Sequence, residues 1–259
     1  MRLITLNIWG GKVFGPLMEF VEGHAGDADI FCMQEVIFGP RSEIAPVSKG
    51  RMNICEEIVH RLPEFSVLAY SAPEEAYYFE AEKLPEDTHP GLVIFVKKSI
   101  GIVDHGGFRC YEEGIPAGAD FGGKMTGSCQ WVRIRKNDGS ESTIMNLHGL
   151  WQTKTEKADT PERIAQSHIL RRFLDEISGE KMLCGDFNLK PDGQSLTMLE
   201  QGMVNLVKTS GATSTRSSLY TKPDKFADYI LVSPDIQAKH FEVLQNEVSD
   251  HLPLLVDWA

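Results

Sequence analysis

The 259-residue chain lacks any apolar run that approaches the roughly 18 residues of a transmembrane helix. Its first residues lack the apolar length and the small-residue cleavage site of a secretory signal peptide. No internal repeat, low-complexity tract or linker rich in proline, glycine and serine divides the chain. We therefore expect residues 1–259 to form a single domain of a cytoplasmic protein without a membrane span.

Cysteine is scarce and irregularly placed. The chain has five, at positions 32, 55, 110, 129 and 184, and none falls in a Cys-x-x-Cys pair. An odd number without such spacing argues against a disulfide framework and against a zinc knuckle. We expect reduced thiols that are buried as small apolar side chains, as is usual in the cytoplasm.

Basic residues are also in deficit. The chain contains 26 Lys and Arg against 37 Asp and Glu, which gives a formal net charge of −11. Sequence-independent binding to nucleic acid depends on many contacts between Lys or Arg and phosphates, so passive polyanion binding is not expected. An enzyme acting on phosphates is not excluded, because a bound cation reverses the local field.

What the chain does contain is a series of short segments rich in Val, Ile, Leu and Phe, which predict β-strands. They are Arg2–Ile8, Asp29–Met33, Leu92–Val96, Gln130–Ile134, Thr143–Leu147, Lys181–Cys184, Ala227–Val232 and Pro253–Val256. Two helices are predicted, Pro161–Ile177 with Thr160 as its N-cap and Arg51–Leu62 before Pro63. Strands outnumber helices and many neighbours resemble hairpins. We therefore expect a four-layer α/β sandwich, in which two mixed β-sheets pack face to face with flanking helices.

Two segments are predicted as long loops. Ser71–Pro90 is acidic and aromatic, and Asp104–Thr126 is rich in glycine. Long structured loops in a compact domain are more often functional rims than spacers.

Polar residues suited to metal and phosphate chemistry stand at the ends of the predicted strands. They are Asn7, Glu35, His148, Asp186, Asn188, Asp228, Asp250 and His251. Strand ends meet at one rim in α/β folds, so we expect these side chains to converge. Carboxylate and amide oxygens favour Mg²⁺ over zinc, and asparagine and imidazole groups can donate to phosphate oxygens. Taken singly, each residue has an alternative role in a turn, a cap or the surface.

The ordered motifs Leu6-Asn7-Ile8, Gln34-Glu35, Asn146-Leu147-His148, Gly185-Asp186-Phe187-Asn188, Asp228-Tyr229-Ile230 and Ser249-Asp250-His251 cover the chain from first to last strand. In this order they resemble the endonuclease/exonuclease/phosphatase superfamily, which has the deoxyribonuclease-I-like fold. The resemblance implies that Glu35 is the principal metal carboxylate. Asn7 and Asp250 would help to hold the metal, which we expect to be Mg²⁺, with Mn²⁺ able to substitute.

The same resemblance implies the catalytic roles. Asp186 would orient or deprotonate the attacking water, and Asn188 would hold that water and a phosphoryl oxygen. His251 would contact the scissile phosphate, oriented by Asp228, and His148 would supply a second donor. Asp228 lies inside the predicted strand Ala227–Val232, so we expect it to be buried and to pair with His251.

These features predict a metal-dependent phosphoesterase in which an activated water attacks in line. The first expectation is a nuclease or phosphodiesterase that cuts nucleic acid. One alternative is a phosphatase or phosphodiesterase acting on a small-molecule or lipid-headgroup phosphoester, and a remote one is an inactive binding module. A monomer is favoured.

Basic residues in loops after the motif strands could clamp phosphate, although a solvated surface charge is the better prediction for each: Arg41, Lys124, Lys154 and Lys157. Trp9 and Trp151 could stack on a base or sugar, although packing is the better prediction.

Overall fold

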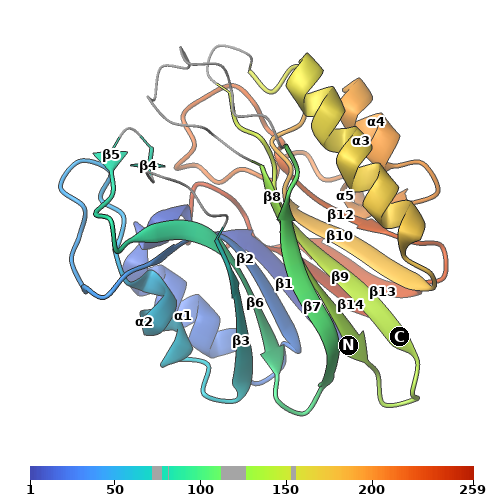
Figure 1. Ribbon diagram of the computed structural model, residues 1–259, viewed down its shortest axis with the longest axis horizontal. Coiled ribbons are helices and arrows are strands. Elements are labelled where there is room, and N and C mark those ends of the chain that lie inside the picture. Colours follow the sequence, from blue (N-terminus) through green and yellow to red (C-terminus); the bar gives the residue numbers. More distant parts are fainter. Residues whose placement is uncertain (72–77, 81, 112–126, 153–155) are drawn as a thin grey trace.

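The computed structural model describes residues 1–71, 78–80, 82–111, 127–152 and 156–259, and contains two six-stranded β-sheets packed face to face (Figure 1). The strands of the first sheet are, in spatial order, β13 (Ala238–Val243), β14 (Leu254–Trp258), β1 (Arg2–Asn7), β2 (Ile30–Phe38), β6 (His89–Lys97) and β3 (Phe65–Tyr70). Those of the second are β11 (Val204–Asn205), β12 (Asp228–Val232), β10 (Glu180–Asp186), β9 (Glu141–His148), β8 (Ser128–Arg135) and β7 (Gly101–Arg109). A short separate hairpin pairs β4 (Tyr78–Phe79) with β5 (Glu82–Lys83).

Helices cover the outer face of each sheet (Figure 1). On the first sheet lie α1 (Phe14–His24), which follows the 3-10 turn η1 (Trp9–Gly11), and α2 (Ile54–Val59). On the second lie α3 (Pro161–Glu176), α4 (Gln194–Leu199) and α5 (Leu206–Ser210). The predicted four-layer sandwich is therefore confirmed. In the described part of the chain no helix combines the length and the apolar character needed to cross a membrane.

Side-chain alternation along the strands builds two apolar layers. Leu3 and Ile30 face the second sheet and join the large core between the sheets. Ile4 and Phe31, their neighbours in sequence, point the other way and pack against α1 and α2. Because successive side chains of a strand point to opposite faces, one apolar segment serves both layers.

Each sheet has a parallel pair of strands near its centre, and these pairs define the functional edge. β1 runs parallel to β2, and β9 runs parallel to β10. The neighbours β14 and β12 run antiparallel to β1 and β10. The carboxyl ends of the four parallel strands and the starts of β12 and β14 therefore lie at a common edge of the sandwich.

A buried polar link joins the sheets just beneath this edge. Gln34 Nε2 donates to Asn146 Oδ1 at 2.6 Å and to Thr5 Oγ1 at 3.1 Å. Asn146 Nδ2 donates in turn to the Met33 carbonyl at 3.1 Å. Gln34 and Asn146 are fully buried, so these hydrogen bonds hold β2 and β9 in a defined relation below the site.

All eight predicted strands are present, but several further elements escaped prediction. α1, β3 and β13 were not predicted, and α2 is shorter than Arg51–Leu62. The prediction of a loop over Asp104–Thr126 is wrong for its first part, because residues 104–109 belong to β7. The glycines there permit close packing: a Cβ on Gly107 would lie 2.3 Å from the Tyr70 ring. In 71–90, the hairpin and the start of β6 replace part of the predicted loop, and residues 72–77, 81 and 112–126 lie outside the described residues.

Candidate active site

Four of the predicted site residues lie on the two parallel pairs of strands, three of them at the carboxyl end of their strand. Asn7 is the last residue of β1, beside Gln34 in β2, and Glu35 follows directly. Asp186 and His148 are the last residues of β10 and β9 and lie opposite each other in register. Asn7, His148 and Asp186 end their strands, and Glu35 lies inside β2 beside the end of β1, so the four side chains meet at one edge.

A β-bulge aims Glu35 at the site. The pairing of β2 with β6 shifts register between Met33 and Val36, and Glu35 has a φ of 54°. Strict alternation would turn Glu35 away from Gln34, toward the helices. The bulge interrupts that alternation and re-aims the carboxylate, at the cost of a left-handed backbone conformation that side chains other than glycine rarely adopt.

The amide of Asn7 joins the two carboxylates. Its Nδ2 donates to Glu35 Oε1 at 2.9 Å and to Asp186 Oδ2 at 3.1 Å. The Trp9 backbone N–H donates to Asn7 Oδ1 at 3.0 Å, which orients the amide so that its NH₂ faces the acids. His148 Nε2 lies 3.6 Å from Glu35 Oε1 and 3.9 Å from Asp186 Oδ2.

The Gly185–Asn188 turn explains the spacing of its motif. Gly185 has a φ of 125°, and a Cβ there would lie 2.2 Å from the Leu147 carbonyl oxygen, so only glycine fits. The Asn188 backbone N–H donates to Asp186 Oδ1 at 3.0 Å, and Asn188 Nδ2 donates to the Gly149 carbonyl at 3.0 Å. Phe187 points into the core between them. The turn thus holds Asp186 and Asn188 at the edge of the sheets, while the buried Phe187 between them fixes the turn to the core.

The expected contact between Asp228 and His251 is present. The distance from His251 Nδ1 to Asp228 Oδ1 is 2.8 Å, and both side chains are about 4% exposed. Asp228 is the first residue of β12 rather than an interior one, and Thr215 Oγ1 accepts a hydrogen bond from its backbone N–H at 3.3 Å. The other ring nitrogen, His251 Nε2, lies 3.6 Å from Asp186 Oδ2, so the imidazole joins Asp228 to the rest of the cluster.

Two cationic side chains complete the site and were not predicted there. Arg216, missed by the sequence analysis, is 8% exposed; its Nη1 lies 3.3 Å from Asp250 Oδ2 and in direct contact with His251 Nε2. Lys157, predicted as a solvated surface charge, is instead only 4% exposed, with Nζ 3.4 Å from the Phe226 carbonyl. The Tyr220 ring lies under both, 4.1 Å from the Arg216 guanidinium and 5.1 Å from Lys157 Nζ. No strand or helix periodicity marks these residues in the sequence.

The other basic and aromatic candidates that the structure describes make surface or packing contacts. Arg41 is exposed and pairs with Asp87 at 3.5 Å, as expected of a surface charge, whereas Lys124 and Lys154 lie outside the described residues. Trp9 packs under Lys12, whose Nζ is 4.1 Å from the ring. Trp151 is half-buried, with Lys222 Nζ 5.4 Å from its ring.

Burial and neighbouring positive charge shift the pKa values of the carboxyl groups at the site in opposite directions. Burial raises the pKa of Glu35, although His148 and the Asn7 amide oppose the shift. Burial acts the same way on Asp186, but the positive charges of His251 and Arg216 prevail and hold its pKa at about 2. Burial and the proximity of Arg216 lower the pKa of Lys157 to about 8.

The donor set fits a divalent metal ion. Glu35, His148 and Asp186 each offer a ligand atom, and these atoms lie within 4.8 Å of one another. Asp228 Oδ2 is buried without a hydrogen-bond partner among the described residues. Carboxylate oxygens dominate the cluster, which suits a hard cation that prefers oxygen ligands.

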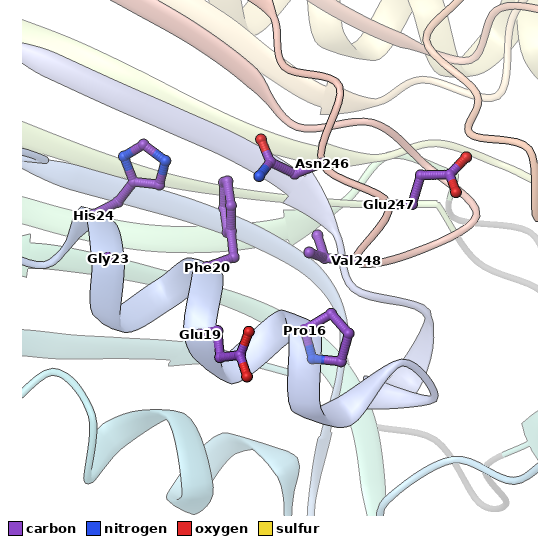
Figure 2. Close-up of a pocket in the computed structure, with 8 residues that line it drawn as sticks. All are labelled: Pro16, Glu19, Phe20, Gly23, His24, Asn246, Glu247 and Val248. Atoms are coloured by element: carbon purple, nitrogen blue, oxygen red, sulfur yellow. The ribbon is translucent and has the colours of Figure 1, made fainter.

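A separate hollow lies along α1. Figure 2 shows it between α1 and the 246–248 segment, where Phe20, His24 and Asn246 are among the lining residues. None of the predicted site residues lines it, so the convergent polar groups and this hollow are different features of the surface.

Comparison with solved structures shows the same fold in several other proteins. A mannosyl-6-phosphatase from Bacteroides thetaiotaomicron is 18% identical, with a TM-score of 0.68 and coverage of 100% of this chain and 99% of that chain. The human Nocturnin catalytic domain with a bound sulfate anion is 19% identical, with a TM-score of 0.71 and coverage of 100% and 93%. ANGEL2, a 2′,3′-cyclic phosphatase in complex with adenosine-2′,3′-vanadate, is 14% identical, with a TM-score of 0.64 and coverage of 99% and 94%. A search of curated protein sequences gives no match.

The family assignment comes from the sequence itself. A profile of the endonuclease/exonuclease/phosphatase family matches residues 4–251, nearly the whole chain. Members of this family are hydrolases that cleave phosphoesters with the help of a divalent metal. From this match and the shared fold, the chain belongs to the endonuclease/exonuclease/phosphatase family.

Proposed function

We propose that the chain hydrolyses a phosphoester by in-line attack of a water molecule at the edge where the four parallel strands end. The observation that carries the proposal is the convergence of Glu35, Asp186 and His251, drawn from three distant motifs. The Asn7 amide donates to both Glu35 and Asp186, and His251 Nε2 lies 3.6 Å from Asp186 Oδ2. Each residue would be ordinary alone, but together they provide acidic ligands and a phosphate donor in one place.

Glu35 and Asp250 would hold the metal through their oxygens, and Asn7, whose NH₂ group faces Glu35 and Asp186, would help by orienting these carboxylates. Mg²⁺ is the proposed ion and Mn²⁺ a substitute. When bound, a divalent ion offsets the charge that develops on phosphate oxygens. Glu35 and Asp186 already share the Asn7 NH₂ group, and therefore face the same small volume.

Asp186 and Asn188 would position the attacking water. The pKa of Asp186 is about 2, so the carboxylate stays ionised at neutral pH and accepts hydrogen bonds. A base this weak favours orientation of the water over full removal of its proton. The Asn188 backbone N–H already fixes one Asp186 oxygen at 3.0 Å and leaves the other toward the site.

His251 and His148 would donate to phosphoryl oxygens. Asp228 fixes the orientation of the His251 ring through Nδ1, so that Nε2 is directed toward Asp186 and the reacting group. His148 Nε2 lies 3.6 Å from Glu35 Oε1 and 3.9 Å from Asp186 Oδ2, so it would supply a second donor close to the same carboxylates.

For the substrate, the charge distribution supports a small phosphoester or a terminal phosphate. Ten described Lys and Arg side chains outside the site each pair with an Asp or Glu, which leaves them poorly placed to follow a nucleic-acid backbone. They are Arg2, Lys12, Arg41, Arg51, Arg61, Arg133, Arg135, Lys136, Arg171 and Lys208.

A nucleic-acid phosphodiester, the first expectation from sequence, is the second candidate. The Trp151–Lys222 pair favours it, because an indole beside a cation can stack on a base and contact its phosphate.

The five cysteines are all buried and unpaired, which supports a reducing compartment such as the cytoplasm for either activity.

A substrate panel tests the proposal. The protein would be incubated with Mg²⁺ and, separately, sugar phosphates, inositol phosphates, a 2′,3′-cyclic nucleotide, RNA, single-stranded DNA, abasic duplex and supercoiled plasmid. Asp186→Asn, which keeps the shape of the side chain, is the matched control. We expect turnover of at least one phosphoester by the wild type and none above background by the variant. Equal activity in both would refute the assigned site.

A further inference from the structure

Arg216 is a buried cation aimed at the point where substrate phosphate would bind. Its side chain is 6% exposed, and its Nη1 contacts both Asp250 Oδ2 and His251 Nε2. Its Nε is buried without a hydrogen-bond partner among the described residues. A guanidinium has five N–H donors, so a buried one with an unused donor signals that an acceptor is absent.

We propose that Arg216 binds a non-bridging oxygen of the scissile phosphate and makes the site selective for phosphate monoesters over diesters. The inference rests on the proposed function, because it assumes that the phosphate binds next to His251. It assigns a substrate class, the terminal phosphate dianion, to that site.

The first argument is geometric. Arg216 Nη1 lies in direct contact with His251 Nε2, so the two groups can reach one acceptor placed beside them. The other ring nitrogen, Nδ1, is already paired with Asp228. A phosphate oxygen placed there would accept hydrogen bonds from both residues. A planar guanidinium suits this task, because its N–H groups match the oxygens of a phosphate in pairs.

The second argument is charge. Four carboxylates gather at the site, and Arg216 and Lys157 offset two of them. A divalent metal would neutralise the other two before either histidine is counted. The site is thus not repulsive to a doubly charged phosphate, and a monoester carries one more negative charge near neutral pH than a diester. The two buried cations therefore attract the monoester more strongly than the diester.

The third argument is the support of the two cations by their surroundings. The Tyr220 ring lies 4.1 Å from the Arg216 guanidinium and 5.1 Å from Lys157 Nζ. Arg163 holds the loop that carries Lys157, since its Nε donates to the Leu150 carbonyl at 3.4 Å and its Nη1 donates to the Ala158 carbonyl. These contacts hold Arg216 and Lys157 in place before a phosphate binds.

A purely structural role for Arg216 is the alternative. In that case the guanidinium serves only to neutralise Asp250, and its removal would change stability or metal binding without changing the preference between substrates. The tests therefore need a ligand readout and a comparison between two substrates.

The binding test uses inorganic phosphate as the probe. Calorimetry with Mg²⁺ present would compare wild type, Arg216→Gln and Arg216→Lys, with Arg135→Gln as the matched surface control, since the Arg135 side chain is 58% exposed and pairs with Glu141. We expect Arg216→Gln to weaken phosphate binding about 10- to 100-fold and Arg216→Lys to weaken it less, because lysine keeps the charge but loses the fork. Unchanged phosphate affinity in Arg216→Gln would overturn the proposal, whether or not the protein proves to be a hydrolase. Melting temperatures with and without Mg²⁺ show that folding and metal binding survive in each variant.

The kinetic test compares p-nitrophenyl phosphate with bis-p-nitrophenyl phosphate. We expect the wild type to favour the monoester in kcat/KM, and Arg216→Gln to lose about 100-fold on the monoester but less than about 10-fold on the diester. Equal losses on both substrates would overturn the selectivity. Absence of turnover of either substrate and of the wider panel would instead refute the proposed function, and the phosphate-binding result would still decide the role of Arg216.

Discussion

Charged residues gather at both ends of the sandwich, and the two ends differ in how far they are buried. At the site edge the Asp186 and Asp228 side chains are 3% and 4% exposed. At the end that carries both termini (Figure 1), Arg2 pairs with Asp27 and Asp257, whose side chains are 47% and 25% exposed. Exposed pairs contribute little to stability, whereas buried charges are costly and persist where function needs them. The comparison predicts that site-edge charges govern activity and terminal-edge charges govern only stability.

Removal of the metal tests the site edge most severely. EDTA should reduce phosphate release to background, and Mg²⁺ or Mn²⁺ should restore it, because the carboxylate cluster needs a cation to tolerate an incoming phosphate. The measurement is phosphate release before chelation, after it and after add-back of each metal. Activity that survives exhaustive chelation would show that the acidic cluster does not work through a metal.

The Asp228–His251 pair is expected to act as one unit. Asp228→Asn preserves shape but removes the charge that orients the ring, and we expect a loss of about 10²- to 10³-fold in kcat. His251→Ala should lose a similar factor, and the double variant should be little worse than either single one. Additive losses would refute the pairing. A loss that merely follows a lower melting temperature would indicate a structural role.

Site residues carried by strands could be predicted from the sequence. Asn7, Asp186 and His148 end apolar strands, so strand prediction alone brings them to one edge, and Asp228 and His251 pair as expected. α1 has an apolar stripe, but Gly15 and Pro16 in its first turn obscured it. Its buried face is formed by Leu17, Met18, Phe20 and Val21.

Arg216 and Lys157 could not be found in this way, because both lie in irregular segments without periodicity. A single backbone bridge between Arg216 and His251 brings the first to the site. A left-handed backbone at Lys157, with a φ of 58°, accompanies the burial of the second. Contacts between distant loops of this kind arise from tertiary packing and leave no local pattern. Sequence prediction was therefore better for the strand-borne half of the site than for the loop-borne half.

Glu35→Gln separates stability from metal binding at the site edge. Glu35 lies beside Asp186 and Asp250, so the metal-free protein holds like charges close together. The amide keeps an oxygen to accept from Asn7 but removes the repulsion. We expect the metal-free melting temperature to rise by about 2–4 °C, which corresponds to roughly 1 kcal/mol for a chain of this size.

The stabilisation that Mg²⁺ gives the wild type should largely disappear in Glu35→Gln, because the bound ion would lose its main carboxylate. Thermal unfolding with and without Mg²⁺ measures both effects, and Asn188→Ala serves as the matched site variant that keeps the acidic ligands. A fall in the metal-free melting temperature of Glu35→Gln would mean that the carboxylate contributes to the fold, and the contrast between the two ends would fail.

Asp257→Asn tests the opposite end, where the smallest effect is expected. Arg2 donates to both Asp257 oxygens, at 2.8 and 2.9 Å, and this hydrogen bonding lowers the pKa of Asp257 below its usual value. A carboxyl group whose pKa is lower in the folded state adds stability above its unfolded pKa of about 4, and that contribution is lost as pH falls through the folded pKa. Both partners are partly exposed, so the loss at pH 7 should be at most about 1 kcal/mol, and it should shrink as pH falls below about 4. Urea unfolding across this pH range measures the effect. Turnover should stay at the wild-type level, because the pair lies at the far end of β1 from Asn7. If the difference in unfolding free energy between wild type and variant were the same at every pH, the Arg2–Asp257 pair would not be its cause. A variant that loses activity while still folded would show that the terminal edge is coupled to the site.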